Sequence, residues 1–245
     1  MAKLTLDELV TQLKAAFGDD LISVVLYGSA AGGEHNPKRS DQNVLVIARN
    51  VPMTAAKAIS ATARAWADAG NPAPLVMTAE EWRESADIFP MEYADILDRN
   101  RVLYGTAPFD GITVRPEDLR LQLEHEAMGK LLKLRQSVLA NAGDNKRLLE
   151  LMAASASTIM VIFRAVCRLH GVTPERDNVK LVDQVAKLAQ VDPEPFQLAV
   201  RVARGESAVP PAEALATVGG YVGGMERLVS HLDHFSAGAR PKPST

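Results

Sequence analysis

The chain has 245 residues, 47% of them hydrophobic and 23% charged, which suits one large domain or two small ones. Its formal net charge of −3 provides no general attraction to nucleic acid or to anionic membranes, so neither is an expected partner. The sequence has no apolar run of about 18 residues, so no membrane span is expected. It has no signal-peptide pattern, and Cys167 has no second cysteine with which to form a disulfide, so a cytoplasmic protein is predicted.

The first hundred residues predict a small α/β unit. Thr5 is placed to cap a helix whose apolar residues recur at three- and four-residue spacing until Gly18. Another helix is expected over 54–69, and Thr78 with Glu81 has the spacing of a capping box. Strands are expected over 21–27, 42–48 and 74–77. The first two are near-continuous apolar runs, which is typical of buried strands.

The pattern changes after residue 105. Segment 106–116 is punctuated by glycine and proline and is expected to link two domains. A long amphipathic helix begins at Pro116, and further helices are expected over 144–169, 178–190, 194–204 and 211–234. The fold class is therefore α/β followed by all-α. The predicted domains are an α/β domain over 1–112, a helical bundle over 113–235 and a disordered tail over 236–245.

Three aromatic features are assigned to packing. Trp66 and Trp82 are expected where helices meet the sheet, and the run 88–93 is expected to pack between the two domains. Cys167 lies inside a helical pattern and is expected to be a small buried apolar residue.

One motif stands out between the first two strands. Leu26-Tyr27-Gly28-Ser29 ends the first apolar run, and Asp41-Gln42-Asn43 opens the second, twelve residues after the serine. This layout resembles the active-site signature of the DNA polymerase β-like nucleotidyltransferases, which include small antibiotic-modifying enzymes with a C-terminal helical domain. In that family the pattern is Gly-Ser followed by Asp-x-Asp, so Asn43 departs from it.

The resemblance implies a nucleotide site with a divalent cation. Glycine lets the backbone approach phosphates, so Gly28 and Ser29 would hold the triphosphate. Alternate residues on a strand point the same way, so Asp41 and Asn43 would both face the Mg²⁺ site. Asp41 is the predicted metal ligand, and Lys38 and Arg39 in the intervening loop are candidate phosphate ligands.

The metal half of the signature is incomplete. The family places a third carboxylate on a neighbouring strand, and segment 74–77 contains neither Asp nor Glu. At an effective dielectric near 20, each missing carboxylate removes roughly 4 kcal/mol of attraction per unit charge before desolvation. The sequence therefore predicts at most one Mg²⁺ ion, delivered with the nucleotide, rather than a two-metal centre.

Three functional hypotheses remain open. The first is a divergent nucleotidyltransferase that moves a nucleoside monophosphate from an NTP to an unknown hydroxyl of a small molecule or protein, in a cleft between the domains. The second is a catalytically inactive nucleotide-binding or protein-interaction relative. The third is a toxin–antitoxin-type module, because Arg164 and His170 fit the loose pattern of HEPN-type RNases. A general base from the second domain would come from the run 124–126, Glu-His-Glu, for which an exposed helix face is the simpler explanation.

Overall fold

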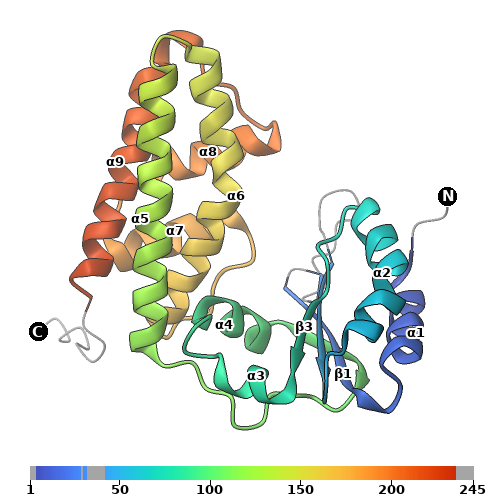
Figure 1. Ribbon diagram of the computed structural model, residues 1–245. Coiled ribbons are helices and arrows are strands. Elements are labelled where there is room, and N and C mark those ends of the chain that lie inside the picture. The colour runs from blue at the N-terminus through green and yellow to red at the C-terminus, as the bar shows by residue number, and fades with distance from the viewer. Residues whose placement is uncertain (1–3, 29, 32–41, 236–245) are drawn as a thin grey trace, which may run out of the picture. The chain divides into compact units, whose positions relative to one another are not determined.

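The computed structural model describes residues 4–28, 30–31 and 42–235 (Figure 1). The chain divides into two compact units, Met1–Val114 and Arg115–Thr245. The tail expected over 236–245 lies outside the described residues.

The first unit is built on a four-stranded mixed sheet of order β3-β2-β1-β4. The central strand β1 is antiparallel to both β2 and β4, and β2 is parallel to β3. The strands are β1 Leu21–Tyr27, β2 Asn43–Ala48, β3 Leu75–Thr78 and β4 Asn100–Gly105. The α-helices of this unit are α1 Leu6–Phe17, α2 Met53–Asp68, α3 Ala79–Glu84 and α4 Pro90–Asp98, and a 3₁₀ turn, η1 Gly18–Asp20, follows α1.

Helices cover both faces of this sheet because β1 and β2 are apolar on both sides. Val24 and Leu26 face α1 and α2, and they share a core with Leu13 and Trp66. The alternate residue Val25 faces the opposite side. There α3 and α4 contribute Trp82, Tyr93 and Ile96 to a second core. Figure 1 shows the pairs α1 and α2, and α3 and α4, on opposite sides of the strands.

The capping box expected at Thr78 is present, and the cap expected at Thr5 is also a full capping box. The Thr5 hydroxyl accepts a hydrogen bond from the Glu8 N–H, and Thr78 accepts one from the Glu81 N–H. In each case the glutamate carboxylate accepts in return from the backbone N–H of the threonine. Two orphan donors are thereby satisfied at each helix start, which fixes where α1 and α3 begin.

The buried aromatic residues of the first unit lie in both of its cores, Trp66 on one face of the sheet and Trp82 with Tyr93 on the other. Trp66 and Trp82 are buried between helix and sheet, as predicted. Tyr93, expected to pack between the domains, instead stacks on Trp82 with ring centroids 4.1 Å apart and donates its hydroxyl to the Trp82 carbonyl at 2.7 Å. Burial raises the pKa of Tyr93 to about 12, so it remains a neutral donor.

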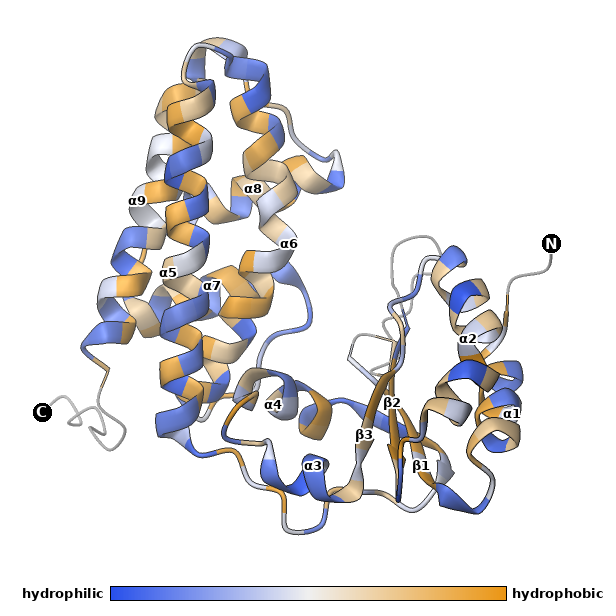
Figure 2. Cartoon of the chain, viewed as in Figure 1, coloured by the Kyte–Doolittle hydropathy of each residue, from blue (hydrophilic) through white to orange (hydrophobic). Residues whose placement is uncertain are grey.

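The second unit is helical throughout its regular structure. Its α-helices are α5 Pro116–Asn141, α6 Asn145–Leu169, α7 Asn178–Ala189, α8 Glu194–Arg204 and α9 Ala214–Asp233, with a 3₁₀ turn, η2 Pro211–Glu213. Figure 2 shows apolar and polar residues intermixed along α5, whose buried residues recur every three or four positions from Leu119 to Leu134. Helix α6 contacts α5, α7, α8 and α9 and is the centre of this core.

Helix α6 corrects one expectation. Its best 18-residue window has a mean hydropathy of 1.6, so by length and composition alone this helix reaches the range of a membrane span. The sequence was expected to contain no such segment. Its buried side chains, among them Ile159, Phe163 and Val166, lie in the core of the helical unit, which accounts for the composition.

Candidate functional site

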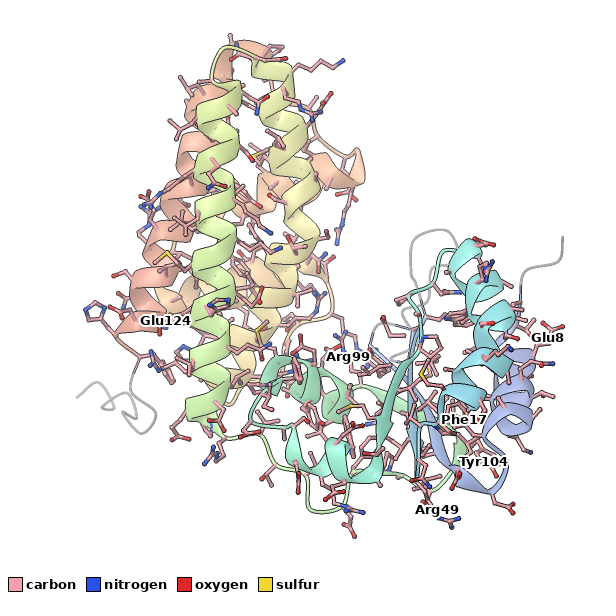
Figure 3. All side chains as sticks on the ribbon, viewed as in Figure 1. Glu8, Phe17, Arg49, Arg99, Tyr104 and Glu124 are labelled. Atoms are coloured by element: carbon pink, nitrogen blue, oxygen red, sulfur yellow. The ribbon has the colours of Figure 1, made fainter. Side chains whose placement is uncertain are left out.

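The motif lies at the end of the sheet where β1 finishes and where β2 and β4 begin. This end of the sheet is called its edge below. Tyr27, the last residue of β1, pairs with Asn43 at the start of β2 and with Asn100 at the start of β4. Residues that follow β1, precede β2 or precede β4 therefore meet at this edge. Figure 3 places Arg99, the residue before β4, at this edge and Arg49, which follows β2, at the other.

Gly28 forms the turn that leaves β1. Its φ of +76° is in the left-handed region that glycine adopts without strain. Its N–H donates to the Arg99 carbonyl at 3.0 Å, and its carbonyl accepts from the Ala31 N–H at 3.1 Å. These bonds tie Gly28 to the segment between α4 and β4 and to Ala31.

The space beside the Gly28 α-carbon is bounded by two polar side chains from different elements. A Cβ on residue 28 would lie 3.5 Å from Asn43 Nδ2 and 3.6 Å from Asp95 Oδ2. The predicted site residue Asn43 is thus brought next to Gly28. Asp95, on α4, was not predicted for this site.

Asp95 is held in place by Arg99. The Arg99 guanidinium donates to Asp95 Oδ1 at 2.6 Å, one helical turn further along the chain. The Arg99 N–H also donates to the Asp95 carbonyl at 3.0 Å. Both side chains are partly buried, with 29% of Asp95 and 18% of Arg99 exposed. A short, partly buried ion pair of this kind limits the rotamers of both side chains.

The entry of the chain into β2 is also braced. The backbone N–H of Gln42 donates to Asn71 Oδ1 at 3.0 Å, and the Asn71 N–H donates to the Trp66 carbonyl at 3.3 Å. Trp66 belongs to α2 and is fully buried. The start of β2, and with it Asn43, is therefore fixed against a rigid part of the core.

Four predicted site residues are not covered by the structure. Ser29, Lys38, Arg39 and Asp41 lie outside the described residues, and their roles remain sequence predictions. The third-strand prediction can be examined directly. Strand β3 carries no Asp or Glu, and its register with β2 starts at Leu45 opposite Leu75, so it has no residue beside Asn43.

The side-chain atoms that border Gly28 do not form a cation site by themselves. Mg²⁺ takes oxygen ligands and is usually held by one or two carboxylates together with substrate phosphates. Near Gly28, Asp95 presents a carboxylate oxygen that belongs to an ion-paired side chain, and Asn43 presents its amide nitrogen Nδ2, which donates hydrogen bonds and does not bind Mg²⁺. Over the described ranges, no group of three or more His, Cys, Asp or Glu side chains is arranged to hold a metal ion.

The residues considered in the second unit have structural partners. Glu124, labelled on α5 in Figure 3, accepts a hydrogen bond from Arg120 at 2.7 Å, and Arg120 also donates to the Leu232 carbonyl of α9. Arg164 donates to Asn178 Oδ1 at 2.8 Å, which links α6 to α7. His170 Nε2 lies 3.0 Å from His231 Nε2. These contacts connect helices of one bundle.

Comparisons with known proteins agree with the fold. No protein-family model matches the chain. The crystal structure of spectinomycin adenyltransferase AAD(9) from Enterococcus faecialis with ATP and spectinomycin superposes with a TM-score of 0.56 and 13% identity, over 93% of this chain and 98% of that one. A protein of Methanocaldococcus jannaschii named "Putative protein adenylyltransferase MJ1305" is 51% identical over 47 residues, which make up 19% of this chain and 31% of that protein.

The two similarities differ in sequence identity and in the share of the chain that they cover. The structural match covers nearly the whole chain at low identity, so it establishes the fold. The sequence match is much closer but spans under a third of the relative's length. The chain therefore has a nucleotidyltransferase-like fold, a small mixed sheet with flanking helices followed by a helical unit, as the Gly28 motif and the domain order predicted.

Proposed function

We propose that this chain is a divergent nucleotidyltransferase that binds ATP at the Gly28 turn and transfers its nucleoside monophosphate to a hydroxyl acceptor. The observation that carries the proposal is the convergence of Gly28, Asn43 and Asp95 at the end of β1. Gly28 belongs to the Gly-Ser motif and Asn43 to the Asp-x-Asn motif, so the two halves of the predicted signature lie next to each other. It occurs in a fold shared with an adenyltransferase solved with ATP.

The reaction is a displacement at the α-phosphorus. The acceptor oxygen forms a bond to that phosphorus, the bond to the pyrophosphate oxygen breaks, and pyrophosphate leaves while the acceptor's proton passes to a base. The protein forms no covalent bond to the substrate in this scheme, so it accelerates the reaction mainly by positioning the reactants and by stabilising charge in the transition state. A divalent cation bound with the triphosphate would neutralise phosphate charge.

Each described residue has a defined task in this scheme. The left-handed turn at Gly28 leaves no Cβ between the phosphates and the sheet edge. Asn43 offers an amide that can serve the cation or a phosphate oxygen. In the proposal, Ser29 and Asp41 add a hydroxyl donor and a carboxylate, as the family pattern implies. The acceptor is a hydroxyl of a small molecule or of a protein.

A second candidate is a non-catalytic nucleotide-binding protein. Two observations favour it: β3 carries no carboxylate, and Asn43 is neutral. Such a protein would use the Gly28 turn for phosphate binding and would leave ATP unchanged.

Tracing the phosphates of ATP separates the two candidates. The chain is incubated with an extract of the organism that encodes it and with ATP labelled at either the α- or the γ-phosphate. Nucleotidyl transfer predicts a product that carries the α-label and not the γ-label, and that is absent when Gly28→Ala replaces the native chain. Binding of ATP without any α-labelled product would favour the non-catalytic candidate. Absence of ATP binding would contradict both.

A further inference from the structure

Helix α5 carries large apolar side chains on two sides. Its buried side faces the core of the helical unit, where α5 contacts α6 and α9, and consists of Leu119, Leu123, Ala127, Leu131 and Leu134. Four further apolar side chains of α5 are between 40% and 83% exposed, namely Leu121, Met128, Leu132 and Leu139. A surface helix that packs in one folded unit needs only one apolar side. The exposed apolar side therefore requires another explanation.

The exposed side of α5 is a regular strip. It consists of six exposed residues, called the α5 seam below: Leu121, His125, Met128, Leu132, Arg135 and Leu139. Successive members are four, three, four, three and four residues apart, which is the spacing by which one helix packs along another. At 1.5 Å per residue the seam is about 27 Å long. A contiguous exposed strip that is mostly apolar is typical of an interaction surface.

The segments of this chain that lie outside the described residues do not match the seam. Residues 1–3, 29, 32–41 and 236–245 contain a single large apolar side chain, that of Met1. A strip of this length is matched instead by a second apolar helix with the same spacing. The α5 seam of another copy of the chain is such a helix.

The seam is self-complementary when two copies run in opposite directions. Its two ends, Leu121 and Leu139, then face each other across the pair, and so do its two central residues, Met128 and Leu132. The two polar members of the seam also face each other. Polar residues in a helix–helix seam weaken the association but fix its register and orientation.

Charges along α5 favour the antiparallel arrangement. Residues 116–128 include four acidic and one basic residue, and residues 129–141 include three basic and no acidic residues. The helix dipole favours such a bias only in the first and last turns, and most of these charges lie further inside the helix. In an antiparallel pair the acidic half of each helix lies along the basic half of the other, whereas a parallel pair places like charges together.

The best-placed pair of opposite charges is formed by Glu124 and Arg135, which lie on the same side of the midline of the seam. In the antiparallel pairing, Glu124 of each copy comes beside the partner's Arg135. Within one chain these two side chains already contact Arg120 and Glu226, and they remain 29% and 47% exposed. Each can therefore form a second ion pair across the seam, because carboxylate and guanidinium groups both offer several hydrogen-bonding sites.

Gly129 lies near the midpoint of the seam, next to Met128. Glycine destabilises the interior of a helix, and no described atom lies within 4 Å of the position that its Cβ would take. Packing within the described part of the chain therefore does not account for this glycine. Two packed helices approach most closely where they cross, and a residue without a side chain leaves room there for a second helix.

We propose that the chain forms a symmetric homodimer in which the α5 seams of two copies pack antiparallel about a twofold axis near Gly129. The same surface is used on both subunits, as in other twofold interfaces. This interaction surface is independent of the proposed nucleotidyl transfer, since none of its residues belongs to the Gly28 site.

Sedimentation velocity of the full-length chain over a range of concentrations tests the association. The 26.4 kDa chain should sediment increasingly as a species of twice that mass as its concentration rises. Leu132→Glu places a charge at the centre of the seam, and a symmetric dimer carries it twice, so the dissociation constant should rise by about a hundredfold or more. Leu215→Glu makes the same replacement at a 56% exposed position of α9 outside the seam and should leave the dimer intact.

A charge exchange tests the antiparallel register. Glu124→Arg and Arg135→Glu should each weaken the homodimer, because each brings like charges together across the seam. A mixture of the two variants should form a heterodimer, because the exchanged charges are then opposite at both ends of the pair. Far-UV circular dichroism checks that each variant is folded. If Leu132→Glu does not fold, the charge exchange decides.

Several results would overturn the proposal. A native chain that stays monomeric at every concentration tested would show that the first unit or a different protein covers the seam. A dimer that Leu132→Glu leaves unchanged, or that Leu215→Glu weakens equally, would place the interface elsewhere. Failure of the two charge variants to form a heterodimer would show that the antiparallel pairing is wrong.

Discussion

Replacing Gly28 by alanine tests the turn on which the site is built. At a φ of +76° an L-residue has a strained backbone, and the cost is about 1–2 kcal/mol. The added methyl group would lie 3.5 Å from Asn43 and 3.6 Å from Asp95, which are ordinary contact distances, so steric overlap adds little. The expected loss in the free energy of unfolding of the first unit is therefore about 1–2 kcal/mol.

Gly111 provides a matched control in the same unit. Its φ is +75°, and no described atom lies within 4 Å of the Cβ position. Gly111→Ala should lose the same stability by urea unfolding as Gly28→Ala, because both variants carry the same backbone strain. Only Gly28→Ala should lose affinity for ATP by calorimetry. Equal ATP affinity in the two variants would refute the placement of the nucleotide at the Gly28 turn.

Replacing Gly105 by alanine should cost the most stability of the three glycine-to-alanine changes. Its φ of +77° matches the other two, but a Cβ there would collide with the backbone carbonyl of Ile22 on the neighbouring strand. Gly105→Ala should destabilise the first unit by more than the strain alone, since β1 and β4 must separate. A loss no larger than that of Gly111→Ala would show that β4 does not pack against β1 as described.

The second unit carries further predictions. In α9, Gly224→Ala would place a methyl group 2.6 Å from the Phe196 ring, so calorimetric unfolding should show a loss of about 1–3 kcal/mol; a gain would contradict that contact. Burial lowers the pKa of both His170 and His231 in the folded chain. On acidification the unfolded chain therefore takes up protons first. The free energy of unfolding should fall as the pH drops from about 7 through the pKa of an unfolded histidine, near 6.5. A double histidine-to-glutamine variant should lose much of that slope, and an unchanged slope would assign it elsewhere. The pKa of Cys167 is raised to about 11 by burial, so iodoacetamide at pH 8 should label it only after denaturation; rapid native labelling would show an exposed thiol.

Local signals in the sequence predicted much of the fold. Strand β1 was predicted over the residues it occupies, because a continuous apolar run bounded by turns has few alternatives. The cap predicted at Thr5 and the capping box predicted at Thr78 marked the starts of α1 and α3, since capping hydrogen bonds form within one helical turn. Gly28 was identified because Gly-Ser after an apolar strand, followed by Asp-x-Asn, resembles the family signature.

Strand β4 was missed for a physical reason. It is an edge strand whose residues are all partly buried or exposed, and it includes Asn100 and Arg101. Such a segment becomes a strand by pairing with β1, far away in the sequence, rather than by its own composition.

Asp95 was missed because its position depends on β4. The acidic residue was expected on segment 74–77, by analogy with the family pattern. Only when Arg99 pairs with the Gly28 N–H does the last turn of α4 arrive beside Asn43. The nearest local signal was the four-residue spacing of Asp95 and Arg99, which indicates an ion pair on a helix but not where that helix docks.

The most direct test of the account is whether the native chain binds ATP, measured as a shift of its unfolding temperature with increasing ATP in the presence of MgCl₂. A ligand that binds the folded state raises the unfolding temperature progressively with concentration. The account predicts such a shift with ATP and none with adenosine, because recognition depends on the triphosphate at the Gly28 turn. No shift at millimolar ATP, or an equal shift with adenosine, would contradict it.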